Sequence, residues 1–96
     1  MSEFGRTPII NNSYGRDHWG KSWSVVLGGC GIHAGAVLGK TNDRGTEVVD
    51  AEVDHANLFH TYLAAVGLDS TESFDINGRK IPMADPASHP IEELLV

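Results

Sequence analysis

The longest amphipathic pattern in the chain lies between Asp54 and Val66. Apolar side chains recur there at the three- and four-residue spacing of one helix face, and they are Leu58, Phe59, Tyr62, Leu63 and Val66. Asp54 is a favourable N-cap residue, and Gly67 suits the position just beyond a helix C-terminus. The pattern therefore predicts a helix over residues 54–66, packed on a small sheet through Leu58, Tyr62 and Val66.

A short apolar run, Ser22–Leu27, has the composition of a strand that is covered on both faces. We expect it to be the strand on which the sheet is built. The glycines after it predict a wide turn with positive φ angles. Cys30, the only cysteine, lies among these glycines, and we expect a small buried thiol there rather than a nucleophile.

The middle of the chain predicts two short strands around a turn. Ala36–Leu38 is a short apolar segment, and Thr41–Gly45 is rich in turn residues. Thr46–Val53 then alternates between apolar and acidic side chains, which is typical of a strand with one solvated face.

Two more elements follow near the C-terminus. The segment Phe74–Ile81 contains Asn-Gly at its centre, which favours the type I′ turn of a β-hairpin. Glu92–Leu95 follows a proline and predicts a final short helix. In the predicted helix, His55 and His60 lie about 140° apart around the axis, so they cannot share a metal. We interpret each as a solvated or capping histidine.

Composition narrows the class of protein. A chain of 96 residues with 41% hydrophobic content suits one small domain and argues against disorder. Its net charge of −6, with scattered basic residues, argues against nucleic acid as a partner. The residues given contain no segment with the pattern of a signal peptide and no apolar run of membrane-spanning length, and we expect that an export signal could lie on a missing part of the protein. We divide the single domain, 1–96, into a motif-bearing loop region, 1–21, and a scaffold, 22–96.

The residues with the most chemistry precede this scaffold. Gly15–Trp19 places a cation, a carboxylate, an imidazole and an indole on consecutive positions, and Ser2–Pro8 adds a second polar cluster. Carboxylate oxygen and imidazole nitrogen bind divalent metals, while arginine matches the oxygens of phosphate or sulfate. The alternative is that Arg16 and Asp17 are solvated loop charges and Trp19 anchors a core. A further alternative is a disordered N-terminal arm.

Both polar clusters, the glycine run Leu27–Gly39, the helix Asp54–Gly67 and the closing Pro90–Leu95 resemble a bacterial family. It is the domain-of-unknown-function family 1501, a sulfatase-like branch of the alkaline phosphatase superfamily. Its members are several times longer than this chain. The resemblance implies an α/β fold, the C-terminal piece of an alkaline-phosphatase-like α/β/α sandwich, which by itself resembles a small α+β domain with a β-hairpin.

The same resemblance implies hydrolysis of phosphate or sulfate esters with help from a divalent metal (zinc, calcium or manganese) in the full-length protein. Glu3 matches an acidic metal ligand, and His18 matches a late histidine ligand. Asp17 would orient His18 or bind metal itself. Arg6 and Arg16 would hold the free oxygens of the ester.

The chain departs from this pattern in ways that change the expected function. The family's nucleophile and remaining metal ligands belong to N-terminal strands, so we expect no catalytic residue, no bound metal and no catalysis in this chain alone. Glu-Phe-Gly also replaces the commoner Asp-His-Gly. We expect self-association or contact with a missing N-terminal region. Family members are often exported, which leaves the compartment open. The alternative is a self-standing small binding or interaction module.

Overall fold

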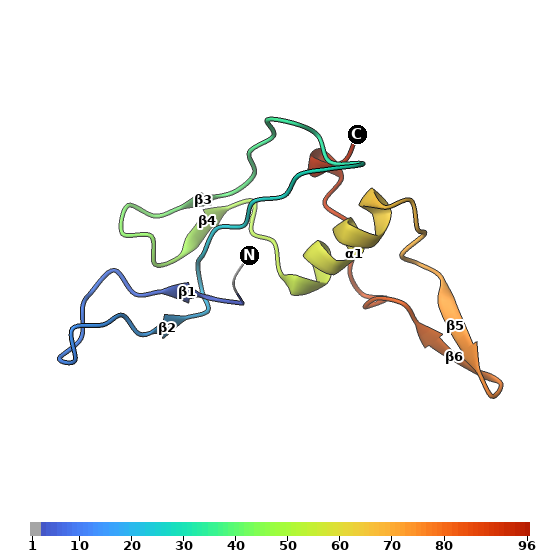
Figure 1. Cartoon of the computed structure of the whole chain (residues 1–96), viewed down its shortest axis with the longest axis horizontal. Coiled ribbons are helices and arrows are strands. Elements are labelled where there is room, and N and C mark those ends of the chain that lie inside the picture. The colour runs from blue at the N-terminus through green and yellow to red at the C-terminus, as the bar shows by residue number, and fades with distance from the viewer. Residues whose placement is uncertain (1–2) are drawn as a thin grey trace. The chain divides into compact units, whose positions relative to one another are not determined.

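The computed structural model describes residues 3–96, which form a mixed α+β structure (Figure 1). Three antiparallel strand pairs each form a separate two-stranded sheet, and the elements are β1 (Gly5–Arg6), β2 (His18–Trp19), β3 (Lys40–Thr41), β4 (Val48–Asp50), α1 (His55–Ala65), β5 (Ser73–Ile76), β6 (Arg79–Pro82) and the 3-10 helix η1 (Glu92–Leu94). The expected α+β character with a hairpin is confirmed. The larger sandwich stays a prediction.

The chain divides into two compact units. The first comprises the chain up to Leu27 together with Leu38–Glu52, and the second comprises Gly28–Val37 together with Val53–Val96. The first unit therefore holds β1 to β4, and the second holds α1, the β5–β6 hairpin and η1. No helix in the described part of the chain is both long and apolar enough to cross a membrane.

Both ends of α1 are fixed by local contacts that the sequence predicts. The Asp54 carboxylate accepts a hydrogen bond from the Asn57 backbone N–H at 2.9 Å, and the Asn57 side chain accepts one from the Asp54 N–H at 3.1 Å, which completes a capping box. At the other end Gly67 has φ 88°, and the Leu68 N–H donates to the Leu63 carbonyl at 3.0 Å. This is a Schellman ending, so the predicted helix is confirmed.

The buried face of α1 is more polar than its apolar stripe predicts. Leu58 is buried as expected, but Val66 is 63% exposed, so the predicted packing through Val66 is wrong. Thr61 is fully buried instead. Its hydroxyl accepts a hydrogen bond from the Ile91 N–H at 2.9 Å and donates to the Asn57 carbonyl at 2.7 Å. Thr61 thereby ties the segment before η1 to the helix.

A glycine allows the loop of the second unit to approach the end of α1. Gly31 has φ 71°, and a Cβ at this position would collide with the Ala65 carbonyl. Nearby, the His33 N–H donates to the Leu94 carbonyl at 2.7 Å, which holds the loop to η1. The predicted positive-φ turn is confirmed, but Cys30 is exposed. The prediction of a buried thiol is therefore wrong, because the turn projects its side chain outward.

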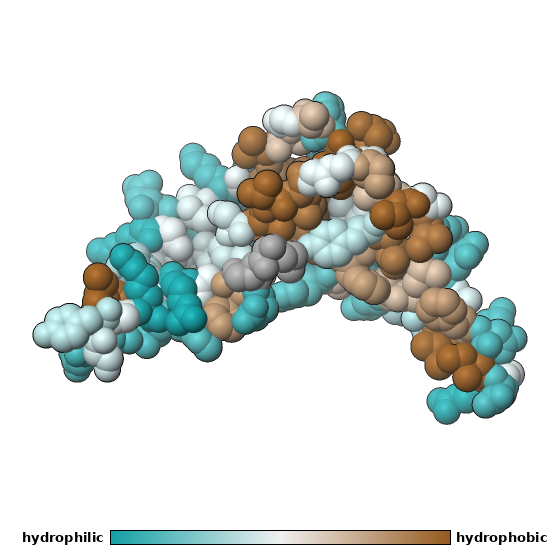
Figure 2. All heavy atoms as spheres, viewed as in Figure 1, coloured by the Kyte–Doolittle hydropathy of each residue, from teal (hydrophilic) through white to brown (hydrophobic). Residues whose placement is uncertain are grey.

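The β5–β6 hairpin forms as the sequence predicts. Phe74 pairs with Ile81, and the two turn residues Asn77 and Gly78 have φ angles of 51° and 80°, as a type I′ turn requires. Phe74, Ile76 and Ile81 are all exposed, and apolar residues are visible along the hairpin at the lower right of Figure 2. Self-association through such a surface stays a prediction.

The other strands differ from the sequence prediction. Ser22–Leu27 belongs to neither a helix nor a strand, and Val26 is 92% exposed, so the prediction that it founds a sheet is wrong. A strand exists only when a second segment pairs with it, and apolar composition does not supply that partner. Instead of Ala36–Leu38, the structure pairs β3 with β4. β4 ends before Ala51, whose φ is 48°.

Candidate functional site

The pairing of β1 with β2 joins the two polar motifs of the sequence. Gly5 lies opposite Trp19, and Arg6 lies opposite His18. The Thr7 N–H continues this pairing with a 3.0 Å hydrogen bond to the Asp17 carbonyl. We call residues 4–7 and 16–19 the motif ribbon. Its formation shows that residues 3–21 are not a disordered arm.

Glycine at position 5 is a steric requirement of the motif ribbon. A Cβ on Gly5 would collide with the carbonyl oxygen of Ser22 and would lie 3.0 Å from the Trp23 Cβ. Ser22 is 5% exposed, so the segment after β2 folds back closely over β1. A side chain at position 5 would therefore force the two strands and this segment apart.

Asn11 organises the loop that connects the two strands. Its side-chain oxygen accepts hydrogen bonds from the N–H groups of Ser13 at 2.9 Å and Gly15 at 3.0 Å. Its side-chain nitrogen donates to the Asp17 carboxylate at 3.0 Å. One amide thus stabilises the turn and also orients the Asp17 carboxylate.

The two arginines each cross the motif ribbon. Arg6 Nη1 donates to the Arg16 carbonyl at 2.8 Å, and Arg16 Nη1 donates to the carbonyls of Thr7 and Pro8, both at 2.8 Å. Both side chains are exposed. Each arginine is held through one nitrogen, Nη1. A guanidinium carries five N–H donors, so each side chain retains further donors. The bonds to these carbonyls restrict the orientation of both guanidinium groups.

Phe4, Arg6 and His18 share one face of the motif ribbon. The Phe4 and His18 ring centroids are 4.0 Å apart with the planes tilted by 31°. The Arg6 guanidinium carbon lies 5.5 Å from the centre of the Phe4 ring. We call these three residues the cationic face. The aromatic ring supports the guanidinium through a cation–π contact and limits the motion of the imidazole.

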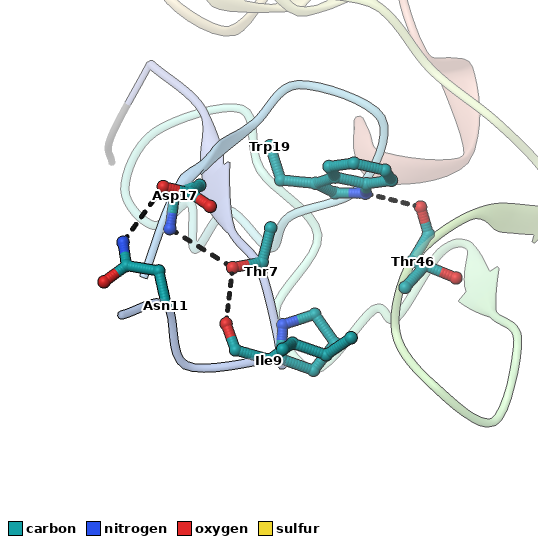
Figure 3. Close-up of a pocket in the computed structure, with 7 residues that line it drawn as sticks. Thr7, Ile9, Asn11, Asp17, Trp19 and Thr46 are labelled. Atoms are coloured by element: carbon teal, nitrogen blue, oxygen red, sulfur yellow. Dashed lines mark hydrogen bonds between the residues drawn. The ribbon is translucent and has the colours of Figure 1, made fainter. Parts of the chain in front are cut away.

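The opposite face of the ribbon lines a pocket of about 280 Å³. In Figure 3 the Asn11–Asp17 pair lies on one side of Thr7, and the Trp19–Thr46 pair lies on the other. The Trp19 indole N–H donates to the Thr46 carbonyl at 2.7 Å, which fixes the indole ring. The lining residues are Thr7, Pro8, Ile9, Asn11, Asp17, Trp19 and Thr46.

The predicted site residues are therefore distributed over both faces. Asp17 lines the pocket, while His18 stacks on Phe4, because consecutive residues of an extended segment project to opposite sides. Glu3 is exposed. Within residues 3–96 no three His, Cys, Asp or Glu side chains gather closely enough to hold a metal ion. Glu3, Asp17 and His18 do not form a complete metal site by themselves, and their role as ligands stays a prediction.

The second unit contains a buried polar network that the sequence pattern does not predict. His60 is 2% exposed, and its two ring nitrogens lie 2.7 Å from the Ser70 hydroxyl and 2.7 Å from the Asp85 carbonyl. Since a carbonyl only accepts, Nε2 donates to the Asp85 carbonyl, and in the neutral imidazole Nδ1 then accepts from the Ser70 hydroxyl. The interpretation of His60 as solvated or capping is wrong. No local pattern marks its burial, because both partners come from distant positions.

The comparisons with known proteins give one match. A family model described as a protein of unknown function (DUF1501) matches residues 1–95. Neither the curated proteins nor the solved structures contain a match to this chain.

Proposed function

The chain belongs to the DUF1501 family of proteins of unknown function, and we propose that its cationic face binds the oxyanion of a phosphate or sulfate ester. In this proposal the chain is the C-terminal part of a metal-dependent ester hydrolase. The observation that carries it is the pairing of Arg6 with His18 across the motif ribbon. That pairing puts the two residues opposite each other on one face of the ribbon, and both side chains are exposed.

The chemistry of the cationic face suits a tetrahedral anion. A guanidinium offers parallel N–H donors that match two oxygens of a phosphate or sulfate group, and an imidazole N–H can reach a third. Arg6 is already held by its bond to the Arg16 carbonyl, so less side-chain entropy is lost when an anion binds. Arg16 adds a second positive charge to the same strand pair. The site is open to solvent, so we expect weak, salt-sensitive binding in this chain alone.

The hydrolysis itself needs groups beyond this face. We infer from the sequence resemblance that the nucleophile would belong to another part of the full-length protein, so the proposed role here is to hold the ester oxygens. A divalent metal would need ligands beyond Glu3, Asp17 and His18, because Asp17 and His18 lie on opposite faces of the ribbon and cannot both bind one ion, whereas a zinc site takes three or four protein ligands. We therefore expect this chain alone to bind such an ion weakly and to hydrolyse no ester.

Titration with inorganic sulfate and phosphate tests this proposal. We expect saturable shifts of the His18 imidazole and the Arg6 Nε resonances in the labelled chain. The Arg6→Gln variant should bind about tenfold more weakly, since it loses a charge-assisted hydrogen bond worth about 1.4 kcal/mol. Arg44→Gln is the matched control, because Arg44 is also exposed and lies in the turn between β3 and β4.

A control titration with chloride at equal ionic strength distinguishes specific oxyanion binding from charge screening by salt. If chloride shifts His18 as much as sulfate does, or if Arg6→Gln and Arg44→Gln respond alike, the cationic face is not an oxyanion site. The alternative function, a small binding module, predicts the same anion binding in this chain. If a longer protein that contains this segment hydrolyses an ester, the hydrolase proposal predicts that replacing Arg6 lowers that activity, whereas the alternative predicts no effect.

A further inference from the structure

The pocket on the other face of the motif ribbon has walls whose polar groups already have partners. The Thr7 hydroxyl donates to the Ile9 carbonyl at 2.9 Å and accepts from the Asp17 N–H at 3.2 Å. The Trp19 indole N–H is bound to the Thr46 carbonyl at 2.7 Å. The Thr7 hydroxyl and the Trp19 indole N–H thus donate within the protein, and the lining of the pocket is mostly apolar, which suits an apolar body.

Asp17 is the exception in this lining. Its carboxylate accepts one hydrogen bond, from the Asn11 side chain at 3.0 Å, whereas a carboxylate can accept about four. Within residues 3–96 it forms no ion pair, because Arg16 next to it donates to the carbonyls of Thr7 and Pro8 instead. Asp17 is exposed to solvent, so the pocket combines apolar walls with one negative charge at its open edge, which has unused acceptor capacity and is held in place by Asn11.

We propose that this pocket binds a small organic cation, with its ammonium group at Asp17 and its apolar body between Ile9 and Trp19. The volume of about 280 Å³ lies just below the usual range of roughly 300–1,000 Å³ for ligand pockets, so the ligand is small. The charge of Asp17 excludes the anions that the cationic face would bind. This inference does not depend on the proposed oxyanion site, which lies on the opposite face.

The indole of Trp19 is compatible with a nearby cation. The Lys21 ammonium nitrogen lies 5.5 Å from the centre of the Trp19 ring, which is within the range of a cation–π contact. Lys21 does not line the pocket, so it does not fill the space beside Asp17. A ligand whose ammonium group binds Asp17 would extend its apolar body past Thr7 toward the indole of Trp19.

The same chemistry is found in a free arylalkylamine and in the lysine side chain of a partner protein. We would therefore titrate the ¹⁵N-labelled chain with 2-phenylethylammonium, and in parallel with Nα-acetyl-lysinamide, while following the Trp19 indole N–H resonance. Tighter binding of the phenyl compound identifies a free aromatic amine, and tighter binding of the lysine derivative identifies a protein side chain. Saturable binding of either supports the cation pocket.

3-Phenylpropionate is the matched probe of opposite charge. We expect it to bind at least about tenfold more weakly than 2-phenylethylammonium, because it places a carboxylate against Asp17. Asp17→Asn should weaken the amine by a similar factor, whereas Asp43→Asn, an exposed acid in the β3–β4 turn, should leave it unchanged.

Equal affinities for 2-phenylethylammonium and 3-phenylpropionate would overturn the proposal. The absence of a saturable shift of the Trp19 indole N–H at millimolar amine would overturn it as well. The charge comparison uses the unmodified chain, so it holds even where Asp17→Asn fails to fold. Sulfate binding at His18 is recorded in the same samples. A sulfate response at His18 without an amine response at Trp19 would contradict the cation pocket alone. An amine response without a sulfate response would contradict the oxyanion site alone.

Discussion

Arg6 lies directly opposite His18 in the β1–β2 pair, although the two residues come from separate polar motifs. This register determines the face of the ribbon on which each neighbouring side chain lies. Asp17, adjacent to His18, faces the pocket, and Phe4, two positions before Arg6, contacts the imidazole at 4.0 Å between ring centroids. One short ribbon thereby separates a cationic face from a pocket that carries a carboxylate.

The close packing around Gly5 predicts that the motif ribbon does not tolerate a methyl group there. Gly5→Ala would push against the Ser22 carbonyl, and overpacking of this kind costs about 1–3 kcal/mol. We expect faster hydrogen exchange of the Thr7 N–H, whose bond to the Asp17 carbonyl closes the ribbon. Gly20→Ala is the control, because a Cβ at Gly20 meets nothing within 4 Å. Equal exchange in both variants would contradict the observed packing.

Removal of the His60 imidazole should destabilise the second unit. His60→Ala leaves a cavity and deprives the buried Ser70 hydroxyl and the Asp85 carbonyl of their partner. We expect a loss of about 2–4 kcal/mol in the free energy of unfolding, measured with urea. His33→Ala, at an exposed loop position, should change it by less than about 0.5 kcal/mol. A similar small loss for His60→Ala would show that this network is not formed.

Alanine substitutions at Gly31 and Gly35 distinguish the cost of backbone strain from that of a steric clash. Both have positive φ, 71° and 79°, so alanine at either position carries the same conformational cost of about 1 kcal/mol. Only at Gly31 would the new Cβ also approach the Ala65 Cα, at 2.7 Å. We expect Gly31→Ala to lower the urea midpoint clearly more than Gly35→Ala. Equal midpoints would mean that the loop does not lie against the end of α1.

Asp69 gives a prediction about pH. The hydrogen bond from the Thr71 side chain, and then that from the Thr71 backbone N–H, lower the pKa of Asp69. A carboxyl whose folded-state pKa is lowered stabilises the folded state above its unfolded pKa, and this contribution is lost as the pH falls through the folded pKa. Thr71→Val should raise the pKa of Asp69, whereas Thr71→Ser should preserve it, in a carboxyl ¹³C NMR titration. An unchanged pKa in Thr71→Val would exclude the side-chain bond as the main cause.

The elements that could be predicted from sequence are those with local causes. Asp54 and Gly67 define the ends of α1 through contacts within a few residues, and Asn77 permits its turn through its own backbone conformation. Ser22–Leu27 was wrongly predicted because a strand needs a partner segment. The buried His60 was missed for a related reason, since its partners Ser70 and Asp85 are brought to it only by folding.

The candidate site was predictable in part. The chemistry of the two polar motifs indicates that they act together, and the structure pairs them. The sequence reasoning grouped Asp17 with His18, but the alternation of side chains along an extended segment separates adjacent residues onto opposite faces. The pocket beside Asp17 could not be foreseen, because Thr46 completes it from a separate part of the chain.

The central claim is that Phe4, Arg6 and His18 share one face of a ribbon whose other face carries Asp17. Nuclear Overhauser contacts between the Phe4 ring protons and the His18 imidazole protons test this arrangement directly. We predict strong cross-peaks between these two rings, because their centroids are 4.0 Å apart. Cross-peaks from the His18 imidazole to Ile9 in place of Phe4 would put His18 on the pocket side and contradict the account.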